Sequence, residues 1–410
     1  MNGASSKKLA PSSGGRMNID VEGLARQCVG CGLCASLRCE EMVERDGFMR
    51  PDTGTLRAVV ENPVYCPVMN WPAIYDENVW GKHEAAYLGW SEDEEIRRNA
   101  SSGGVLTEIL CHLLETGEVD AVMQVGPSAD CPLFSEPKLS RTVEEVVANS
   151  GSRYVSCDGL GRIAELLDTN ETFALVGRPC EVRAVRLLME TDKRFVGRIA
   201  YLLSFFCMGA PSMDAVRRLD ARLNPGHEKV VRLRYRGDGW PGYATETFVD
   251  GSSSRVTYDE SWGQILGRDL ESYCRFCFDG LGEYADVSAG DAWHQNGDGT
   301  PDFKEHDGRN VIFARTPKGK ALLDECAATG ALHLEPFSDW NYLSTIQKSQ
   351  YQRKMTLAAR LKVLKLTGRR FCSADILKLG RYSKQIPLGK RLRTAYGMFK
   401  RVAMGRVRVP

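Results

Sequence analysis

Two groups of cysteines restrict what this 410-residue chain can fold into more than any other feature. The later group is the pair Cys274-x-x-Cys277, which Asp279 and a Gly290-Asp291 turn follow closely. Two thiols three residues apart face one point and can bind a single metal centre from one turn of the chain. Such a centre needs two further ligands, so the fold must bring them to this pair from elsewhere.

The earlier group is the run Cys28-x-x-Cys31-x-x-Cys34. This spacing is typical of bacterial ferredoxins, in which three thiolates hold one face of a [4Fe-4S] cluster and a more distant Cys-Pro supplies the fourth ligand. Cys66 precedes a proline and is our preferred fourth ligand, although Cys39 lies nearer in the sequence. A zinc knuckle or a set of buried thiols is the alternative interpretation.

The cysteine content also bears on where the protein is located. Fourteen cysteines would indicate disulfides in a small secreted protein, but this chain is long and no apolar segment follows Met1. Clustered thiols in a cytosolic protein usually bind metal or carry redox chemistry. The longest strongly apolar run, residues 199–207, is too short to span a bilayer and favours a buried strand. We therefore expect a cytoplasmic protein with no transmembrane segment.

The chain divides into regions that together predict a mixed α/β fold. Strand, turn and helix patterns alternate through the centre, with a cysteine-rich front and a basic rear on either side. The predicted regions are a disordered lead-in (1–18), a ferredoxin-like [4Fe-4S] module (19–75), two parts of a central α/β region (80–165 and 166–335) and a basic helical tail (340–410). Residues 76–98 are interpreted as a connection into the central region.

Two short motifs in the central region are candidates for ligand binding. Ser101-Ser102-Gly103-Gly104 precedes a helix whose apolar positions begin at Val105 and share one face. Such a helix start presents free amides and a positive dipole end, which suits a phosphate, whereas N-capping by serine is the plain alternative. Gly151-Ser152-Arg153-Tyr154 combines a flexible turn, a hydroxyl, a guanidinium and an aromatic ring, and can hold a phosphate and stack on a ring system.

Two strand, turn and helix units follow. Residues 172–176 and 199–206 are predicted strands, and each ends at a tight turn that carries a cysteine, Cys180 in the first and Cys207 in the second. Ligands of open parallel sheets gather outside the carboxyl ends of the strands. Both cysteines are thus candidates for the two ligands that the Cys-x-x-Cys pair lacks, although thiols that merely pack would look the same.

Later segments are predicted to complete the sheet and add an insert. Three β-rich segments, 229–236, 244–249 and 254–258, indicate an antiparallel insert. The turn at 239–243 carries an aromatic pair that either covers a planar cofactor or seals the core. The compact part is expected to close with a strand at 308–316 and a helix at 318–328.

The rear of the chain is strongly basic, since residues 351–410 carry seventeen Lys and Arg and a single acid, Asp375. The helical spacing of its leucines predicts a tail that contacts an anionic membrane surface or an acidic partner, unless it is only a solvated extension. No recognised nucleic-acid-binding motif accompanies this charge, so nucleic acid is not an expected partner.

Seven motifs occur in an order that resembles the coenzyme F420 hydrogenase/dehydrogenase beta-subunit family, over about residues 80–330. They are Ser101-Ser102-Gly103-Gly104, Gly151-Ser152-Arg153-Tyr154, Gly177-Arg178-Pro179-Cys180, Phe206-Cys207-Met208-Gly209, Trp240-Pro241-Gly242, Cys274-x-x-Cys277-x-Asp279 and Ala285-Asp286-x-x-x-Gly290-Asp291. The front module is similar to the branch of this family that includes 7-hydroxymethyl chlorophyll a reductase.

The resemblance implies a flavoprotein that carries FAD beside one or two [4Fe-4S] clusters. It implies that the first two motifs, together with Gly290 and Asp291, contribute to the flavin site. It also implies an inner cluster held by Cys180, Cys207, Cys274 and Cys277. With the front set of Cys28, Cys31, Cys34 and Cys66, two clusters are expected.

A cluster moves one electron at a time, whereas a flavin stores two and delivers a hydride. The chain is therefore predicted to take electrons from a ferredoxin or a partner redox subunit and to pass them through the clusters and FAD to a small two-electron acceptor such as coenzyme F420. The alternatives are an electron-transfer subunit of a larger complex, a reductase in a polysaccharide-related pathway, and a zinc-stabilised scaffold. No catalytic residue is assigned, because His294, the one histidine inside a motif, is more simply a half-exposed side chain.

Overall fold

The computed structural model describes residues 19–70, 76, 78–369, 371, 376–405 and 407. The predicted lead-in, residues 1–18, lies outside the described residues. Within the described ranges, no helix is both long and apolar enough to cross a membrane.

An eight-stranded mixed sheet forms the centre of the molecule, in the order β15-β3-β14-β11-β7-β6-β4-β5. Four neighbouring strands are parallel: β4 (Ala121–Pro127), β6 (Phe173–Gly177), β7 (Ile199–Phe205) and β11 (Val287–Asp291). The other four are antiparallel to their neighbours: β5 (Ser135–Ser140), β14 (Asn310–Ala314), β3 (Ala85–Ser91) and β15 (Leu332–Pro336). The predicted mixed α/β class and the predicted strands of the central region are confirmed, and the carboxyl ends of the parallel strands meet at one edge.

The prediction that residues 76–98 form a mere connection is wrong, because β3 is an integral strand of this sheet. β3 pairs with β14 on one side and with β15 on the other, so that Gly89 lies opposite Asn310 and Leu334. Both partners come from more than two hundred residues further along the chain. No local hairpin signal accompanies such a strand, which explains why its sequence did not reveal it.

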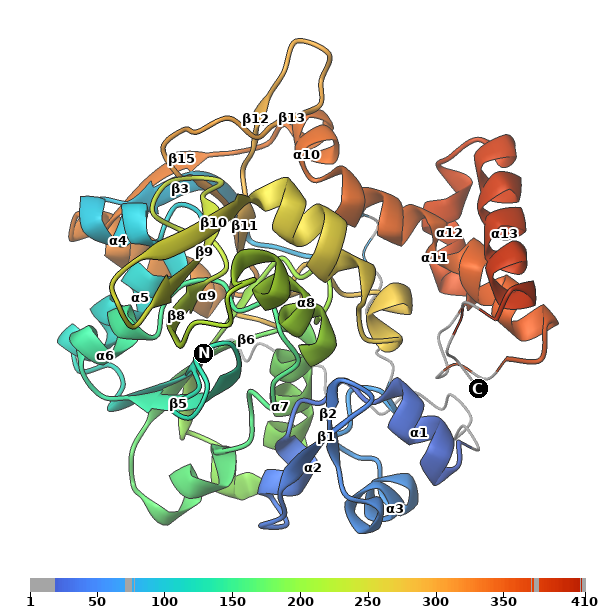
Figure 1. Cartoon of the computed structure of the whole chain (residues 1–410), viewed down its shortest axis with the longest axis horizontal. Helices are drawn as coiled ribbons and strands as arrows, with labels where there is room; N and C mark the ends of the chain where they lie inside the picture. The colour runs from blue at the N-terminus through green and yellow to red at the C-terminus, as the bar shows by residue number, and fades with distance from the viewer. Residues whose placement is uncertain are drawn as a thin grey trace, which may run out of the picture.

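Helices cover both faces of the sheet (Figure 1). On one face, apolar side chains of α5 (Val105–Glu115), α6 (Val143–Ala148) and α9 (Pro317–Ala328) pack against the strands in one core. On the other face, α7 (Pro179–Thr191) packs in a second core, which also receives the front module. A short helix, α4 (Glu94–Asn99), leads from β3 toward α5.

The front module lies at the bottom of Figure 1 and shares the core of α7. It consists of α1 (Val21–Gln27), α2 (Leu33–Ser36), the hairpin of β1 (Met42–Arg45) and β2 (Phe48–Pro51), and α3 (Thr53–Glu61). Leu33 and Leu56 of this module pack in one cluster with Leu160 and Ile163 of the central region. The cysteine-rich front is therefore fixed against the sheet rather than tethered to it.

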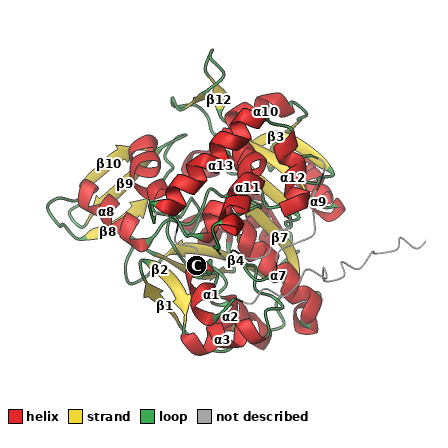
Figure 2. Cartoon of the chain, turned by 90° about the vertical axis from the view of Figure 1, so that its right-hand side faces the viewer, coloured by secondary structure: helices red, strands yellow, loops and turns green. Residues whose placement is uncertain are grey.

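The predicted antiparallel insert is confirmed as a three-stranded sheet in the order β10-β9-β8. Its strands are β8 (Val230–Arg234), β9 (Tyr243–Phe248) and β10 (Ser253–Thr257). The helix α8 (Met213–Leu223) packs on it, and Figure 2 shows this unit projecting on the left of the molecule. A smaller hairpin of β12 (His294–Gln295) and β13 (Pro301–Asp302) stands at the top of Figure 1.

Four helices follow the sheet: α10 (Trp340–Ile346), α11 (Lys348–Leu366), α12 (Ile376–Lys384) and α13 (Leu388–Ala403). The expectation that the compact part closes with the helix at 318–328 is wrong, because α11 is built into the core. Leu357, Leu361 and Leu364 are buried there beside Phe276 and Phe278 of the Cys-x-x-Cys segment. The helical spacing of these leucines therefore marks the face of α11 that is buried in the core, within a segment that is otherwise basic.

Candidate functional site

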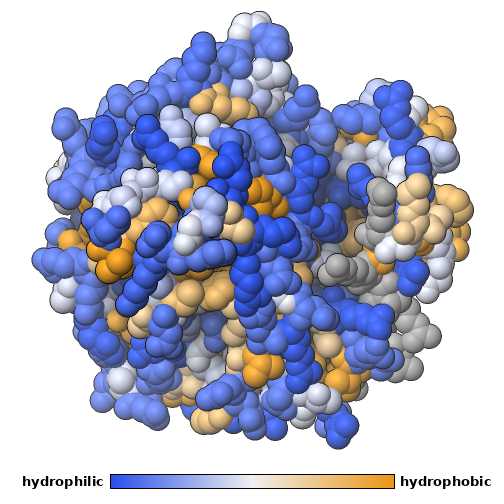
Figure 3. Space-filling view, viewed as in Figure 1, coloured by the Kyte–Doolittle hydropathy of each residue, from blue (hydrophilic) through white to orange (hydrophobic). Residues whose placement is uncertain are grey.

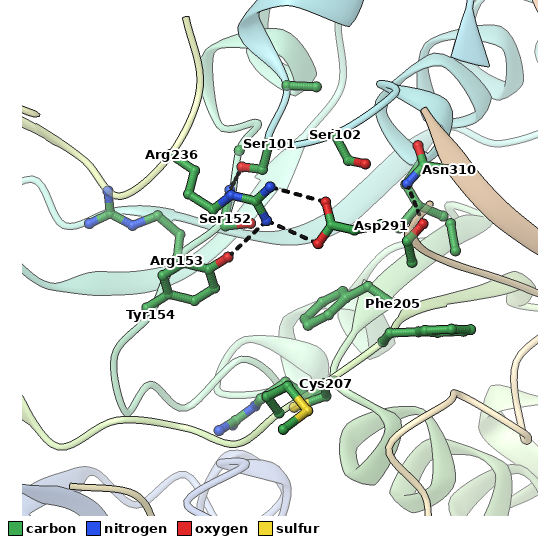
Figure 4. Close-up of a pocket in the computed structure, with 18 of the residues that line it drawn as sticks. Ser101, Ser102, Ser152, Arg153, Tyr154, Phe205, Cys207, Arg236, Asp291 and Asn310 are labelled. Atoms are coloured by element: carbon green, nitrogen blue, oxygen red, sulfur yellow. Dashed lines mark hydrogen bonds and ion pairs between the residues drawn. The ribbon is translucent and has the colours of Figure 1, made fainter. Parts of the chain in front are cut away.

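A cavity of about 610 Å³ opens at the carboxyl edge of the parallel strands. It is lined by the amino end of α5, the segment 149–155, the ends of β6 and β7, Asp291 at the end of β11, and the amino end of α11 (Figure 4). A cavity of this size is in the range of small-molecule and cofactor sites. The location agrees with the rule that ligands of open α/β sheets bind beyond the carboxyl ends of the strands.

The amino end of α5 faces this cavity without a side-chain cap among the described residues. Gly104 occupies the N-cap position with a φ of 78°, a conformation that favours glycine. Ser101 instead accepts a hydrogen bond from the backbone N–H of Ser152 through its Oγ, at 2.7 Å. Ser102 donates to the carbonyl oxygen of Arg309 at 2.9 Å. The alternative in which serine caps the helix is therefore wrong, and the first-turn amides face the cavity.

The hydrogen bond between Ser101 and Ser152 brings two predicted motifs together, as Figure 4 shows. Arg153 in the second motif does not offer its guanidinium to the cavity, however. It donates to the backbone carbonyls of Pro132, Phe134 and Leu233 at 2.6–3.0 Å and to the Ser135 hydroxyl at 2.8 Å. Arg153 and Tyr154 both line the cavity, but protein acceptors occupy the Arg153 guanidinium and tie the motif to the insert and to the start of β5.

Asp291 forms a buried ion pair with Arg236 at the cavity wall. The guanidinium of Arg236 donates to both carboxylate oxygens, at 3.0 and 3.1 Å, and to the Tyr154 hydroxyl at 3.3 Å (Figure 4). The indole N–H of Trp240 donates to the same carboxylate at 2.9 Å. Asp291 therefore orients Arg236, a cation from the insert, toward the cavity.

Of the aromatic pair at the turn 239–243, only Trp240 seals the core, because Tyr243 is exposed. Trp240 is buried and stacks on Trp293, with ring centroids 4.6 Å apart and an interplanar angle of 3°. Gly290 lies near the end of β11, where a Cβ atom would lie 2.3 Å from the ring of Phe206, so only glycine fits there. His294 is half-buried and does not line the cavity. The centroids of the His294 and His306 rings lie 4.3 Å apart.

The front cysteines surround a second, smaller pocket. Cys28, Cys31, Cys34 and Cys66 all line it. Cys39 does not, and it is exposed with a φ of 56°. Burial raises the pKa of the Cys66 thiol to about 11. Burial together with the neighbouring thiols raises the pKa of the Cys31 thiol well above its usual value. Four desolvated thiols around one pocket are strongly disfavoured as free thiolates, so a cationic centre that binds them would compensate for their burial.

The inner cysteines come together from three loops. Cys180 begins α7 beyond β6, Cys207 follows β7, and Cys274 and Cys277 lie on the Cys-x-x-Cys turn. Burial raises the pKa of Cys207 to about 11 and that of Cys180 and Cys274 to about 12, and each of these thiols interacts electrostatically with another of the set. The predicted convergence of strand ends and Cys-x-x-Cys turn is thus observed, while the ligand it holds stays a prediction.

No group of three or more His, Cys, Asp or Glu side chains in the described ranges is arranged around one point in the way a single metal ion requires. The thiols are instead distributed around the walls of a pocket at the front and around converging loops inside.

Buried polar contacts join the front and inner thiol sets. Arg50 of β2 forms a bidentate ion pair with Glu271, at 2.6 and 2.7 Å, three residues before Cys274. Arg183 of α7 donates to the carbonyl of Pro67 and to the Tyr273 hydroxyl. The inner set in turn reaches the large cavity, because Cys207 lines it. Front pocket, inner thiols and cavity therefore form a series.

The helix α11 supports the inner set from outside. Gln350 and Arg353 both donate to the carbonyl oxygen of Cys207, at 3.0 and 3.1 Å, and Arg353 also donates to that of Met208 at 2.8 Å. Lys354 forms a buried ion pair with Glu283, beyond the Cys-x-x-Cys turn. These contacts explain why α11 has buried polar side chains.

The sequence did not reveal several residues that line the cavity. They come from the insert, the small hairpin and the C-terminal helices: Arg236, Tyr258, Trp262, Phe303, Gln347 and Gln350. None follows a spacing that identifies a site, since each approaches the cavity through tertiary folding. The nearest signal in the sequence was the aromatic turn that follows Arg236. Pro241 in this turn accepts a hydrogen bond from Arg236, and Trp240 donates to Asp291, the ion-pair partner of Arg236.

Fold and site together define a class: an α/β protein whose ligand cavity lies beyond the parallel strands and beside converging thiols, an arrangement typical of oxidoreductases. Sequence comparison then identifies the family. Residues 86–163 match the N-terminal part, and residues 170–339 the C-terminal part, of "Coenzyme F420 hydrogenase/dehydrogenase, beta subunit". The chain belongs to this family of oxidoreductase subunits, which confirms the resemblance.

Individual relatives are about 25% identical to this chain over the aligned residues. Coenzyme F420 hydrogenase subunit beta of Methanosarcina barkeri is 25% identical over 270 residues, which are 63% of this chain and 84% of that protein. Coenzyme F420-dependent sulfite reductase of Methanocaldococcus jannaschii is 24% identical over 249 residues, 57% of this chain and 36% of that protein. A chain in the structure of the F420-reducing [NiFe] hydrogenase complex from Methanosarcina barkeri matches with a TM-score of 0.53 at 21% identity, covering 68% of this chain and 92% of that one, which shows the shared fold.

Proposed function

We propose that this chain is an iron-sulfur flavoprotein that passes electrons between a redox partner and a small two-electron acceptor. The observation that carries the proposal is the serial arrangement of the front thiol pocket, the inner thiols and the large cavity, with Cys207 shared by the last two. The buried Arg50–Glu271 ion pair fixes the front thiol pocket in position relative to the inner thiols. A chain of centres in fixed order is what electron transfer requires.

The thiols fit two [4Fe-4S] clusters. Cys28, Cys31, Cys34 and Cys66 would hold the front cluster in a ferredoxin-like module, and Cys180, Cys207, Cys274 and Cys277 would hold the inner one. Thiolate is the normal ligand of such clusters, which carry single electrons. Gly32, at the start of α2 with a φ of 82°, lets the backbone pass close to the front pocket.

The large cavity fits FAD. The uncapped amides of α5, with Ser101, Ser102, Gly103 and Gly104, would bind the pyrophosphate. Gly151, Ser152, Arg153 and Tyr154 border the same space, and Arg153 also fixes the loop through its bonds to backbone carbonyls. Bound FAD would accept electrons singly and deliver them as a hydride. Gly290 and Asp291 would form part of the cavity wall, and Asp291 would orient the Arg236 guanidinium toward the bound FAD.

The names of the relatives suggest an acceptor and a donor. Because relatives bear the names coenzyme F420 hydrogenase subunit beta and coenzyme F420-dependent sulfite reductase, coenzyme F420 or a similar conjugated molecule is the proposed acceptor. A ferredoxin or a partner redox subunit is the proposed donor, docking near the front module. An electron-transfer subunit without its own acceptor site would carry the same cofactors and would not turn over added F420.

The decisive experiment is anaerobic purification with iron, sulfide and flavin analysis. We expect about eight irons and one FAD per chain, and a loss of about four irons in either Cys28→Ala or Cys274→Ala. Cys131→Ala is the matched control, because Cys131 is half-buried but lines neither pocket. A colourless protein, or one with zinc in place of iron, would remove the proposal.

A further inference from the structure

The helix α13 carries an apolar stripe that the described part of the chain leaves exposed. Leu392, Tyr396 and Phe399 are 61%, 70% and 55% exposed, and Leu388 is exposed as well. At 100° per residue, these four positions fall within an arc of about 80° on the helix surface. Scattered surface leucines are ordinary, but four large apolar side chains on one arc indicate a contact surface.

The stripe is held in place from behind. Met398 is buried, and Ala395 and Val402 pack against the main core, where α11 and α13 lie together. These three residues occupy the arc next to the exposed one, so the helix cannot turn its stripe inward without losing its anchor. Figures 1 and 2 both place α13 at the outside of the molecule.

Positive charge borders the stripe. The segment 388–403 contains Lys390, Arg391, Arg393, Lys400 and Arg401 and no acid. Arg393 and Lys400 are exposed and fall on the arc beside Tyr396. The neighbouring α12 adds the exposed Arg381 and Lys384. Figure 3 shows apolar residues gathered over α12 and α13 at the right-hand edge, next to hydrophilic ones.

We propose that α13 is an interfacial helix that docks this protein on a lipid bilayer rich in anionic headgroups. The 16 residues of α13 span about 24 Å and would lie in the plane of the bilayer rather than cross it. The aliphatic and aromatic side chains enter the acyl boundary while Arg393 and Lys400 reach the phosphates. A bilayer with anionic headgroups matches the apolar stripe and its cationic border at once, because it offers acyl chains to the stripe and phosphates to the cations.

The location of α13 agrees with this role. The match to the family ends at residue 339, so α13 lies outside the matched region. It lines neither the large cavity nor the front thiol pocket. Docking through α13 would leave the proposed redox sites as they are.

The test is flotation of the full-length holoprotein with vesicles of phosphatidylcholine alone or with roughly one third phosphatidylglycerol. We expect binding to the anionic vesicles only, weakened between about 0.1 and 0.5 M NaCl. Leu392→Gln/Phe399→Gln should reduce the bound fraction about tenfold, and Arg393→Gln/Lys400→Gln should reduce it and flatten its salt dependence. The control Val231→Gln/Val249→Gln removes two exposed apolar side chains of the insert and should bind as the wild type does.

Amide hydrogen exchange locates the contact. Peptides from 388–403 should become protected on anionic vesicles, whereas peptides from 230–257 should not. The proposal fails if neither vesicle binds, if both bind equally, if the Leu392/Phe399 variant binds normally, or if protection arises elsewhere. Iron and flavin content, measured on the same samples, reports separately on folding and on the redox proposal.

Discussion

The ion pair of Arg50 and Glu271 allows a quantitative test of how the front module is attached. The side chains of Arg50 and Glu271 are 8% and 1% exposed, and both guanidinium nitrogens donate to carboxylate oxygens, at 2.6 and 2.7 Å. Removing one partner leaves the other charge buried without compensation. We therefore expect Arg50→Met or Glu271→Leu alone to lower the free energy of unfolding by about 3–5 kcal/mol.

The double variant Arg50→Met/Glu271→Leu should recover most of this loss, because two apolar side chains of similar volume leave no buried charge. With about 2 °C per kcal/mol in a large domain, each single variant should melt roughly 6–10 °C lower and the double variant within a few degrees of the wild type. Thermal unfolding followed by circular dichroism gives the melting temperatures of the wild type, the two single variants and the double variant.

A matched control comes from the pair of Arg141 and Glu171, which has the same bidentate geometry at 2.6 and 2.8 Å. Its Arg141 side chain is 47% exposed, so solvent screens the pair. Arg141→Met should cost no more than about 1 kcal/mol. If the losses in Arg50→Met and Glu271→Leu simply add in the double variant, the pair is not energetically coupled and the reasoning is refuted.

Three further predictions concern the titration of a buried acid and the two ligand sites. Burial raises the pKa of the Glu246 carboxyl to about 8, so the folded protein holds this proton more tightly than the unfolded chain and the free energy of unfolding falls as pH rises from about 4.5 to about 8. Urea midpoints of Glu246→Gln should therefore exceed those of the wild type at pH 8.5 by more than at pH 6, and an unchanged difference would contradict the burial argument. Cys66→Ser should lose about four irons per chain while Cys39→Ser keeps them, and iron analysis showing the reverse would reassign the fourth ligand. Asp291→Asn should release Arg236 and lower bound flavin severalfold, whereas Asp302→Asn, on the nearby hairpin, should retain it in a flavin assay; equal flavin in both would show that Asp291 does not organise the cavity.

Much of the central fold follows from local pattern. The helices after Gly104, Arg178 and Ser212 and the strands β6 and β7 could be predicted because each has its own apolar period and turn residues. The placement of Cys180 and Cys207 at one edge followed from the rule for parallel strands. These features depend on residues that are neighbours in sequence.

Other features depended on partners distant in sequence. β3 was missed because its hydrogen-bonding partners, β14 and β15, come from the other end of the central region. The serines of the first motif could equally be interpreted as a helix cap. Gly104 at the N-cap position and the hydrogen bonds of Ser101 and Ser102 to other segments excluded that role. Arg153 was predicted to bind a phosphate, yet its guanidinium donates to the backbone carbonyls of Pro132 and Phe134 before β5 and of Leu233 in the insert.

By itself, the sequence determined the cysteine spacing, the alternating strand and helix pattern and the basic rear of the chain, because short-range periodicity encodes these directly. The tertiary structure decided that Cys66 rather than Cys39 lines the front pocket, that Arg236 faces the cavity from the insert, and that α11 is core while α13 presents its stripe outward. The physical reason is that burial and ion pairing are set by which surfaces meet. A one-dimensional pattern specifies which face of a helix is apolar, but not what covers it.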